Sequence, residues 1–180
     1  RLTSQMRVSG GQAYLEFTRA LFTDTPIAAT SFNGYDLRFY EDLAEMRGDL
    51  LELDSKHGLA RLLAGFAWPW LSKKDKAAVD IEIDGLKLQW NQTATDWVNS
   101  PTSQYEVGSI HTIQGYDLNY AGVIIGNDIA FDPKSKRVTF VRENYHDVKG
   151  RENNAARGIK YSDEIIRRKA GKAGKIGGKK

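Results

Sequence analysis

Residues 111–117 gather several side chains that suit binding of a nucleotide or a nucleic-acid backbone. His111, Thr112, Gln114 and Asp117 stand between two strand-like runs, which read "VGSI" and "AGVIIG". In parallel α/β sheets, ligands bind at the carboxyl ends of the strands, and this segment directly follows one such end. The pattern therefore predicts a ligand-binding loop.

Two further features of this segment suit a nucleotide. Gly115 allows the backbone to approach a ligand closely, and the carboxylate of Asp117 is able to accept a hydrogen bond from a ribose hydroxyl. A purely structural explanation stays open, in which the same polar side chains only cap the connection between a strand and the next element.

The segments before this loop predict a parallel sheet with helices. Apolar residues recur at helical spacing over residues 12–22, and an amphipathic helix with an acidic first turn is predicted for residues 42–56. A short strand is predicted for residues 35–42, and a strand covered on both faces for residues 59–68. Strand, helix and strand in this order indicate an α/β fold.

Two β-hairpins decorate the predicted sheet. Residues 79–90 alternate polar and apolar side chains around Asp84 and Gly85, a strong hairpin signal, and residues 129–141 predict a second hairpin. A last helix is predicted for residues 161–169, with Ser162 as its N-cap. No internal repeat or linker divides the chain, so one domain is expected.

The composition fits one globular domain. The chain has 180 residues, including four Trp, eight Tyr and seven Phe, which are large enough to fill a core. It has no cysteine, which excludes disulfides and thiolate metal sites. No apolar run approaches the roughly 18 residues of a membrane span. We therefore expect a cytoplasmic protein without a membrane partner, and the initial Arg1 suggests a piece of a longer chain.

The charge is distributed unevenly. Residues 167–180 hold seven of the 26 basic residues and none of the 23 acidic residues, so the net charge of +3 comes from this tail and the rest of the chain is mildly acidic. Such a Gly- and Lys-rich tail is expected to be disordered and to attract phosphate backbones without sequence preference. A merely solubilising end explains the same composition.

Several motifs resemble those of known helicases. The stretch "IHTIQGYDLNYAGVIIG" is similar to the fifth motif of UvrD-type superfamily 1 helicases, and "LTSQMR", which ends in Arg7, resembles their fourth motif. Together with "RLLAGFAWPWLSKKD", "DWVNSP" and "RENYHD", these stretches look like a family of uncharacterised P-loop proteins related to the Schlafen group 3 helicase domain. The resemblance covers roughly residues 1–168 and implies the second RecA-like domain of a two-domain motor.

The resemblance implies roles for residues on the nucleotide side of the cleft. Arg7 is expected to reach the γ-phosphate of ATP and to neutralise the charge that develops in phosphoryl transfer. Gln114, Gly115 and Asp117 are expected to line the nucleotide, with Asp117 near the ribose, in a place where family members often carry Glu.

The same resemblance implies that His111 and Thr112 face the backbone of DNA or RNA. A lone His after a strand is often a structural residue instead, and an Arg such as Arg7 is often a surface partner of an acid.

Some parts of the motor are missing from the sequence. Neither the phosphate loop "GxxxxGK[ST]" nor the acidic magnesium site is present, and the final Arg-bearing motif is not found. The prediction is a partial RecA-like domain at residues 1–166 with the tail at 167–180. This domain depends on an upstream RecA-like partner domain for ATP and Mg²⁺ and is inactive alone. The alternative is a non-catalytic nucleic-acid-binding module.

Two other hypotheses concern metal binding by the acidic and histidine residues. Asp80, Glu82 and Asp84 alternate on a predicted strand, as three ligands of a nuclease Mg²⁺ would, but an exposed hairpin face explains them equally. The three histidines show no ligand spacing, so no metal site is expected.

The tryptophans suggest another contact with nucleic acid. Stacking of unpaired bases is conceivable for Trp68, Trp70, Trp90 and Trp97. Trp68 continues a buried run and is expected in the core, whereas Trp70 precedes "LSKKDK" and is expected to be exposed.

Overall fold

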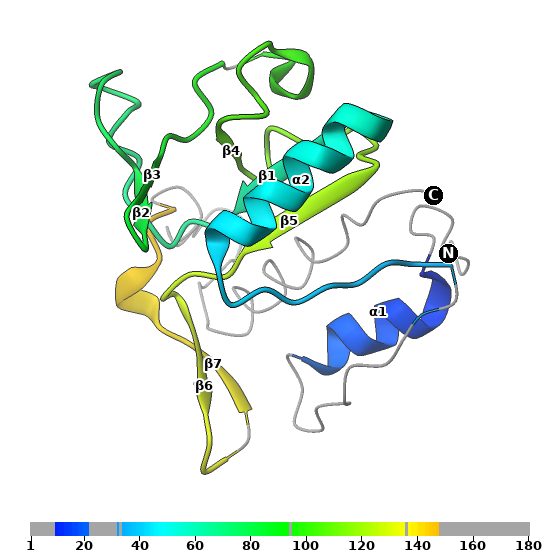
Figure 1. Ribbon diagram of the computed structural model, residues 1–180. Coiled ribbons are helices and arrows are strands. Elements are labelled where there is room, and N and C mark those ends of the chain that lie inside the picture. Colours follow the sequence, from blue (N-terminus) through cyan, green and yellow to red (C-terminus); the bar gives the residue numbers. More distant parts are fainter. Residues whose placement is uncertain (1–9, 22–31, 33, 94, 136, 148–180) are drawn as a thin grey trace, which may run out of the picture.

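The computed structural model describes residues 10–21, 32, 34–93, 95–135 and 137–147. Its centre is a parallel sheet of three strands, in the order β4-β1-β5 (Figure 1). The strands are β1 (Ala60–Ala64), β4 (Val107–Gly108) and β5 (Tyr120–Ile124). Leu62 pairs with Val107 on one side and with Gly122 on the other. This sheet confirms the α/β class.

Helix α2 (Leu43–His57) covers one face of the sheet (Figure 1). It begins at Asp42, whose Oδ1 accepts hydrogen bonds from the backbone N–H groups of Ala44 (2.6 Å) and Glu45 (3.0 Å), and an N-cap of this kind satisfies donors that the first turn leaves unpaired. Leu50 packs directly over Gly122, where a Cβ would lie 2.4 Å from the Leu50 Cδ1. The glycine therefore allows the helix to approach the sheet closely.

The second face of the sheet is covered by the chain around a short 3₁₀ helix, η1 (Trp97–Asn99). Leu63, Trp97, Val98, Ile113 and Leu118 form a buried cluster there. A Cβ at position 108 would lie 2.5 Å from the Trp97 ring, so only glycine fits that place in β4. The sheet thus has a core on each side.

A buried ion pair ties this second core to helix α2. Arg61 Nη1 lies 2.7 Å from Asp54 Oδ1, and the Arg61 side chain is 9% exposed. Its Nε and Nη2 also donate to the carbonyl of Val98, at 3.2 and 2.8 Å. One guanidinium therefore joins α2, β1 and η1.

The two predicted hairpins are present. Strands β2 (Ile81–Ile83) and β3 (Leu86–Leu88) are antiparallel, as are β6 (Ile129–Asp132) and β7 (Arg137–Phe140). The first hairpin turns at Asp84 and Gly85, whose φ angles are 51° and 81°. Gly and Asp tolerate this left-handed region, which explains why the Asp-Gly signal succeeded. A second short 3₁₀ helix, η2 (Arg142–Asn144), follows β7.

Helix α1 (Gly11–Ala20) packs with Phe32 in a small separate cluster. The strand predicted for residues 35–42 is wrong, because this segment forms only an isolated bridge between Phe32 and Tyr35. Its polar side chains bind α2 instead: Arg38 and Tyr40 both hydrogen-bond to Asp49.

The predicted last helix, its cap Ser162 and the basic tail at 167–180 lie outside the described residues. In the described part of the chain, no helix is long and apolar enough to cross a membrane.

Candidate functional site

The predicted ligand-binding segment forms a loop between β4 and β5, which we call the motif loop (residues 109–119). Its backbone turns twice, with hydrogen bonds from Thr112 N to Ser109 O (3.2 Å) and from Tyr116 N to Ile113 O (3.1 Å). Ile113 and Leu118 are buried in the second core cluster. These two apolar side chains anchor the loop, whereas His111, Gln114 and Asp117 are exposed.

His111 lies at the carboxyl edge of the sheet, as predicted. Its side chain is exposed, its backbone N–H donates to Ser109 Oγ (3.3 Å), and its ring lies 5.8 Å from the ring of Phe66. Phe66 follows the carboxyl end of β1. The histidine therefore stands over the ends of two neighbouring strands, where a ligand of an α/β sheet binds.

Thr112 has a different environment from His111. Its hydroxyl accepts from Ser109 N (2.9 Å) and lies within donating distance of Asn91 Oδ1 (3.0 Å) and Ser109 O (2.9 Å). A hydroxyl has one proton, so it donates to one of these acceptors at a time. The threonine thus shapes the beginning of the motif loop through bonds within the protein.

The three residues expected beside a nucleotide share one exposed turn. Gln114, Gly115 and Asp117 are all exposed. Gly115 has φ of 99°, and no atom lies within 4 Å of where its Cβ would be, so its backbone is open to a ligand. An amide, an open backbone and a carboxylate are a donor and acceptor set that fits a nucleotide's sugar and base.

A tyrosine fixes this turn. The Tyr116 hydroxyl donates to Asp96 Oδ1 at 2.6 Å, and this hydrogen bond raises the pKa of Tyr116 above its usual value. Arg7, which the resemblance places near the γ-phosphate, lies outside the described residues. Its role stays a prediction.

Sequence reasoning missed Asn91. Its side-chain Oδ1 accepts from Ser109 N (3.0 Å), and Thr112 Oγ1 lies at 3.0 Å from it, so it holds the base of the motif loop from a segment distant in sequence. Asn91 is buried and has a left-handed φ of 36°. Asn tolerates this conformation better than most residues, but no local pattern of "WNQT" indicates the partner.

Asp128 was also missed, although the reasoning that found His111 applies to it. It follows β5 at the same edge of the sheet and is 6% exposed. Its Oδ2 lies 3.8 Å from where a Cβ of Gly65 would be, and both residues line a cavity of about 540 Å³ that also reaches Phe140. Burial raises the pKa of this carboxyl group.

The raised pKa predicts how Asp128 affects stability. Burial disfavours the charged carboxylate. The contribution of Asp128 therefore lowers the free energy of unfolding of the wild type as pH rises from about 4, the ordinary pKa of Asp, through the folded-state pKa. We expect Asp128→Asn to raise the free energy of unfolding at neutral pH, with a difference that vanishes at acidic pH. Urea unfolding across this pH range measures the effect.

Asp132→Asn is the matched control, because its expected effect has the opposite sign. The hydroxyl of Ser135 donates to Asp132 Oδ2 (2.6 Å) and lowers the pKa of Asp132, so the charged form is favoured in the folded state. An Asp128→Asn protein that is less stable than wild type at neutral pH would contradict the assigned penalty.

The acids of the first hairpin do not converge on a metal. Asp80 is buried and accepts from Ser72 N and Trp90 N, both at 2.7 Å, and from the Ser72 hydroxyl. Glu82 and Asp84 are exposed. Within the described ranges, no group of three His, Cys, Asp or Glu residues is placed to hold a metal ion.

The tryptophans divide between core and surface. Trp90 and Trp97 are fully buried and cannot stack on bases, and Trp68 packs, as expected, against the core cluster that contains Leu50, Leu62 and Trp90. Trp70 is half-buried, donates from Nε1 to Ser72 Oγ (3.1 Å) and has Lys73 Nζ 5.3 Å from its ring centre.

The fold and the motif loop define an α/β protein with a polar loop that begins at the carboxyl edge of a parallel sheet. A comparison with protein families then identifies the group: the chain belongs to the family of the Schlafen group 3 DNA/RNA helicase domain, whose model matches residues 1–172. Membership of this family indicates a nucleic-acid-related function.

Two curated proteins are similar to the chain. "Uncharacterized protein YPL245W" of Saccharomyces cerevisiae is 31% identical over 128 residues, which cover 68% of this chain but only 28% of the yeast protein. "Large ribosomal subunit protein uL6" of Bifidobacterium animalis subsp. lactis is 29% identical over 144 residues, with 75% of this chain and 73% of that protein covered. No solved structure matches the chain significantly.

Proposed function

We propose that the chain is the second, RecA-like motor domain of an ATP-dependent DNA/RNA helicase-like protein. The observation that carries this proposal is the motif loop, whose exposed His111 stands at the carboxyl edge of the parallel sheet, with the exposed Gln114 and Asp117 further along the same loop before it enters β5. A two-domain motor binds ATP between its domains, and closure of the cleft changes the grip on the nucleic acid. A loop that begins at this edge is well placed to present side chains to both ATP and the nucleic acid.

The proposal divides the motif loop between the two ligands. Gln114, Gly115 and Asp117 contact the nucleotide, with the Asp117 carboxylate at the ribose, and Arg7 contacts the γ-phosphate. His111 contacts the nucleic-acid backbone. Thr112 holds the part of the loop that carries His111, because its hydroxyl is already bonded to Ser109 and Asn91.

ATP supplies the phosphoryl group for hydrolysis in this proposal, and Mg²⁺ is held by an upstream domain that carries a phosphate loop. The chain's own residues bind the sugar and sense the terminal phosphate. The sequence of this chain has no phosphate loop, so the isolated chain is proposed to be inactive as an ATPase.

A second candidate function is a nucleic-acid-binding module without a motor. The similarity to uL6 favours it, since by its name that protein belongs to the large ribosomal subunit. In this alternative, the exposed motif loop binds RNA or DNA directly and no ATP is involved. ATP hydrolysis by the intact protein separates the two candidates.

Substitution of His111 tests the motor proposal. In the intact protein, His111→Ala is expected to raise the nucleic-acid concentration that half-stimulates ATP hydrolysis roughly 10- to 150-fold, as loss of one hydrogen bond to a charged group, about 1.5–3 kcal/mol, requires. Steady-state hydrolysis measured against increasing single-stranded DNA or RNA gives this concentration.

His57→Ala is the matched control. His57 is also exposed, but it lies in the last turn of α2, and its ring is 5.6 Å from that of Tyr120 at the amino end of β5, whereas His111 lies at the carboxyl edge. Only its backbone carbonyl contacts the motif loop, by accepting a hydrogen bond from Asn119 Nδ2 (2.9 Å), and the alanine variant keeps that carbonyl. We expect the His57 variant to be stimulated like wild type. Equal stimulation of the two variants would remove His111 from the nucleic-acid contact, and an intact protein without any ATP hydrolysis would favour the binding module.

A further inference from the structure

Four exposed lysines lie in the loop before the first hairpin and on its second strand: Lys73, Lys74 and Lys76 in the loop and Lys87 in β3, which we call the lysine surface. Among the described residues, none of the four forms an ion pair with a carboxylate. The exposed acids of the same loop and hairpin are Asp75, Glu82 and Asp84; Asp75 Oδ1 accepts a hydrogen bond from Ala77 N (3.0 Å), and Glu82 stands opposite Lys87 in the hairpin. The exposed lysines therefore outnumber the exposed acids of this segment by one, four against three.

The loop that carries three of these lysines is firmly held. Gln89 Nε2 donates to the carbonyls of Lys76 (2.7 Å) and Ala78 (2.9 Å), and Lys74 N donates to Leu71 O (3.0 Å). The buried carboxylate of Asp80 holds Ser72 N at the start of the same loop. A loop with a fixed backbone loses little conformational entropy when it binds a partner.

The lysine surface is joined to the motif loop by two consecutive residues. Asn91 accepts a hydrogen bond from Ser109 in the motif loop. The next residue, Gln92, donates from Nε2 to Ser72 Oγ (2.8 Å), at the start of the loop that carries three of the lysines. One short segment thus fixes the position of both loops.

A row of aromatic rings makes the same connection. The ring of Phe66 lies 5.8 Å from that of His111 and 5.2 Å from that of Trp90, and Trp90 lies 6.4 Å from Trp70. Lys73 stands over Trp70 at the end of the row. Contacts between these aromatic rings therefore connect the lysine surface to His111.

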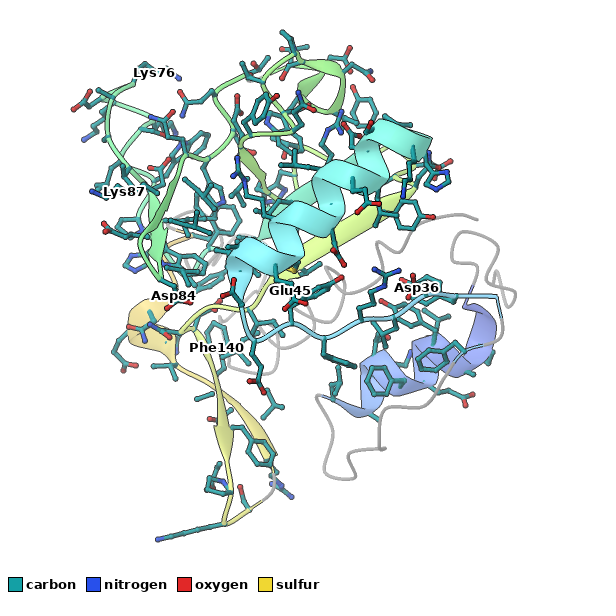
Figure 2. The ribbon with its side chains drawn as sticks, viewed as in Figure 1. Asp36, Glu45, Lys76, Asp84, Lys87 and Phe140 are labelled. Atoms are coloured by element: carbon teal, nitrogen blue, oxygen red, sulfur yellow. The ribbon has the colours of Figure 1, made fainter. Side chains whose placement is uncertain are left out.

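The charge on the other side of α2 has the opposite sign. Figure 2 shows Lys76 and Lys87 on the outer side of the loop and hairpin, Glu45 at the first turn of α2, and Asp36 farther from the lysines. Asp36, Glu41, Asp42 and Asp49 line the cavity there, and the Arg38 side chain is already paired with Asp36 and Asp49. A polyanion is repelled from that side and attracted to the lysines.

We propose that the lysine surface is a phosphate-backbone interface for single-stranded nucleic acid, continuous with the contact at His111. This inference rests on the proposed nucleic-acid function and extends it to a second region of the chain. Lysines contact phosphates as point charges, so the interface binds without regard to base sequence. Each lysine that neutralises a phosphate releases a counterion and makes binding more sensitive to salt.

The test compares two double variants of the full chain, each of which removes two positive charges. Lys76→Gln with Lys87→Gln changes the lysine surface, and Lys56→Gln with Lys134→Gln changes exposed lysines elsewhere. Fluorescence anisotropy with labelled single-stranded DNA and RNA is measured from low to moderate salt. The slope of log affinity against log salt is expected to become shallower by about 1.4 in the first variant, at about 0.7 per lost phosphate contact, and to stay unchanged in the second.

The outcomes separate this inference from the function on which it rests. Wild-type binding with the same slope in both double variants overturns the lysine surface alone and leaves the contact at His111 in place. A wild-type chain that binds neither polymer overturns both. The basic tail is present in every protein compared, so its contribution cancels. Binding of an acidic polypeptide such as polyglutamate, without binding of either oligonucleotide, overturns the interface in favour of a protein partner.

Discussion

In the intact protein, Arg7→Ala is expected to lower ATP turnover roughly a thousandfold, the lower end of what an arginine contributes to phosphoryl transfer. In the proposed function the planar guanidinium of Arg7 neutralises charge that develops on the transferred phosphate, and the motif loop contains no Lys or Arg that could replace it. Steady-state ATP hydrolysis with saturating single-stranded DNA or RNA measures the loss.

Two control proteins make the Arg7 result interpretable. Arg7→Lys keeps the charge but not the planar fork, so we expect an activity between those of wild type and the alanine variant. Arg19→Ala removes an exposed arginine from the last turn of α1 and should hydrolyse ATP normally. Normal turnover by Arg7→Ala would exclude the assigned contact with the γ-phosphate.

Arg61→Met is expected to destabilise the fold by about 3–5 kcal/mol, the usual consequence of removing one partner of a buried ion pair. The Asp54 carboxylate loses its cation, and the carbonyl of Val98 loses two donors that reach it at 3.2 and 2.8 Å. The total stability of a domain is about 5–15 kcal/mol, so much of it depends on this residue. Urea unfolding followed by tryptophan fluorescence reports the change.

Arg38→Met provides the comparison for Arg61. Arg38 also bonds to carboxylates, those of Asp36 and Asp49, but its side chain is 48% exposed. Exposed pairs contribute only about 0–1 kcal/mol, so a small change is expected. Equal losses in the two variants would mean that burial does not decide the strength of the Arg61 pair.

The parts of the fold that follow from local chemistry could be predicted from the sequence. The Asp42 cap and the Asp84-Gly85 turn act on their own neighbours, so helix α2 and the first hairpin were placed correctly. Residues 35–42 were not, because an alternating pattern does not reveal whether a partner strand exists. Arg38 and Tyr40 reach Asp49 instead.

The exposed position of His111 at the carboxyl edge could be predicted from the sequence, but the contacts that hold its loop could not. His111 is exposed at the carboxyl edge because a polar run after a buried strand must leave the core there. Asn91, which fixes the base of the motif loop, and Trp97, which packs on Gly108, act across long stretches of chain. Contacts of this kind leave no local trace in sequence. The choice between a phosphate contact and a structural bond for Thr112 likewise needed the positions of its neighbours.

The pairing of β1 has a consequence for synthesis of the protein. Its ladder partners, β4 and β5, both come much later in the chain, with Ala60 paired to Tyr120. As the chain leaves the ribosome, α2 and β1 emerge together, but the apolar strand has no neighbour until residues beyond 107 have been made. Pairing between distant segments is slow, and unpaired apolar strands aggregate. Helix α2 packs on β1 and directly precedes it. We therefore expect α2 to cover the apolar strand during translation, before β4 and β5 have been made.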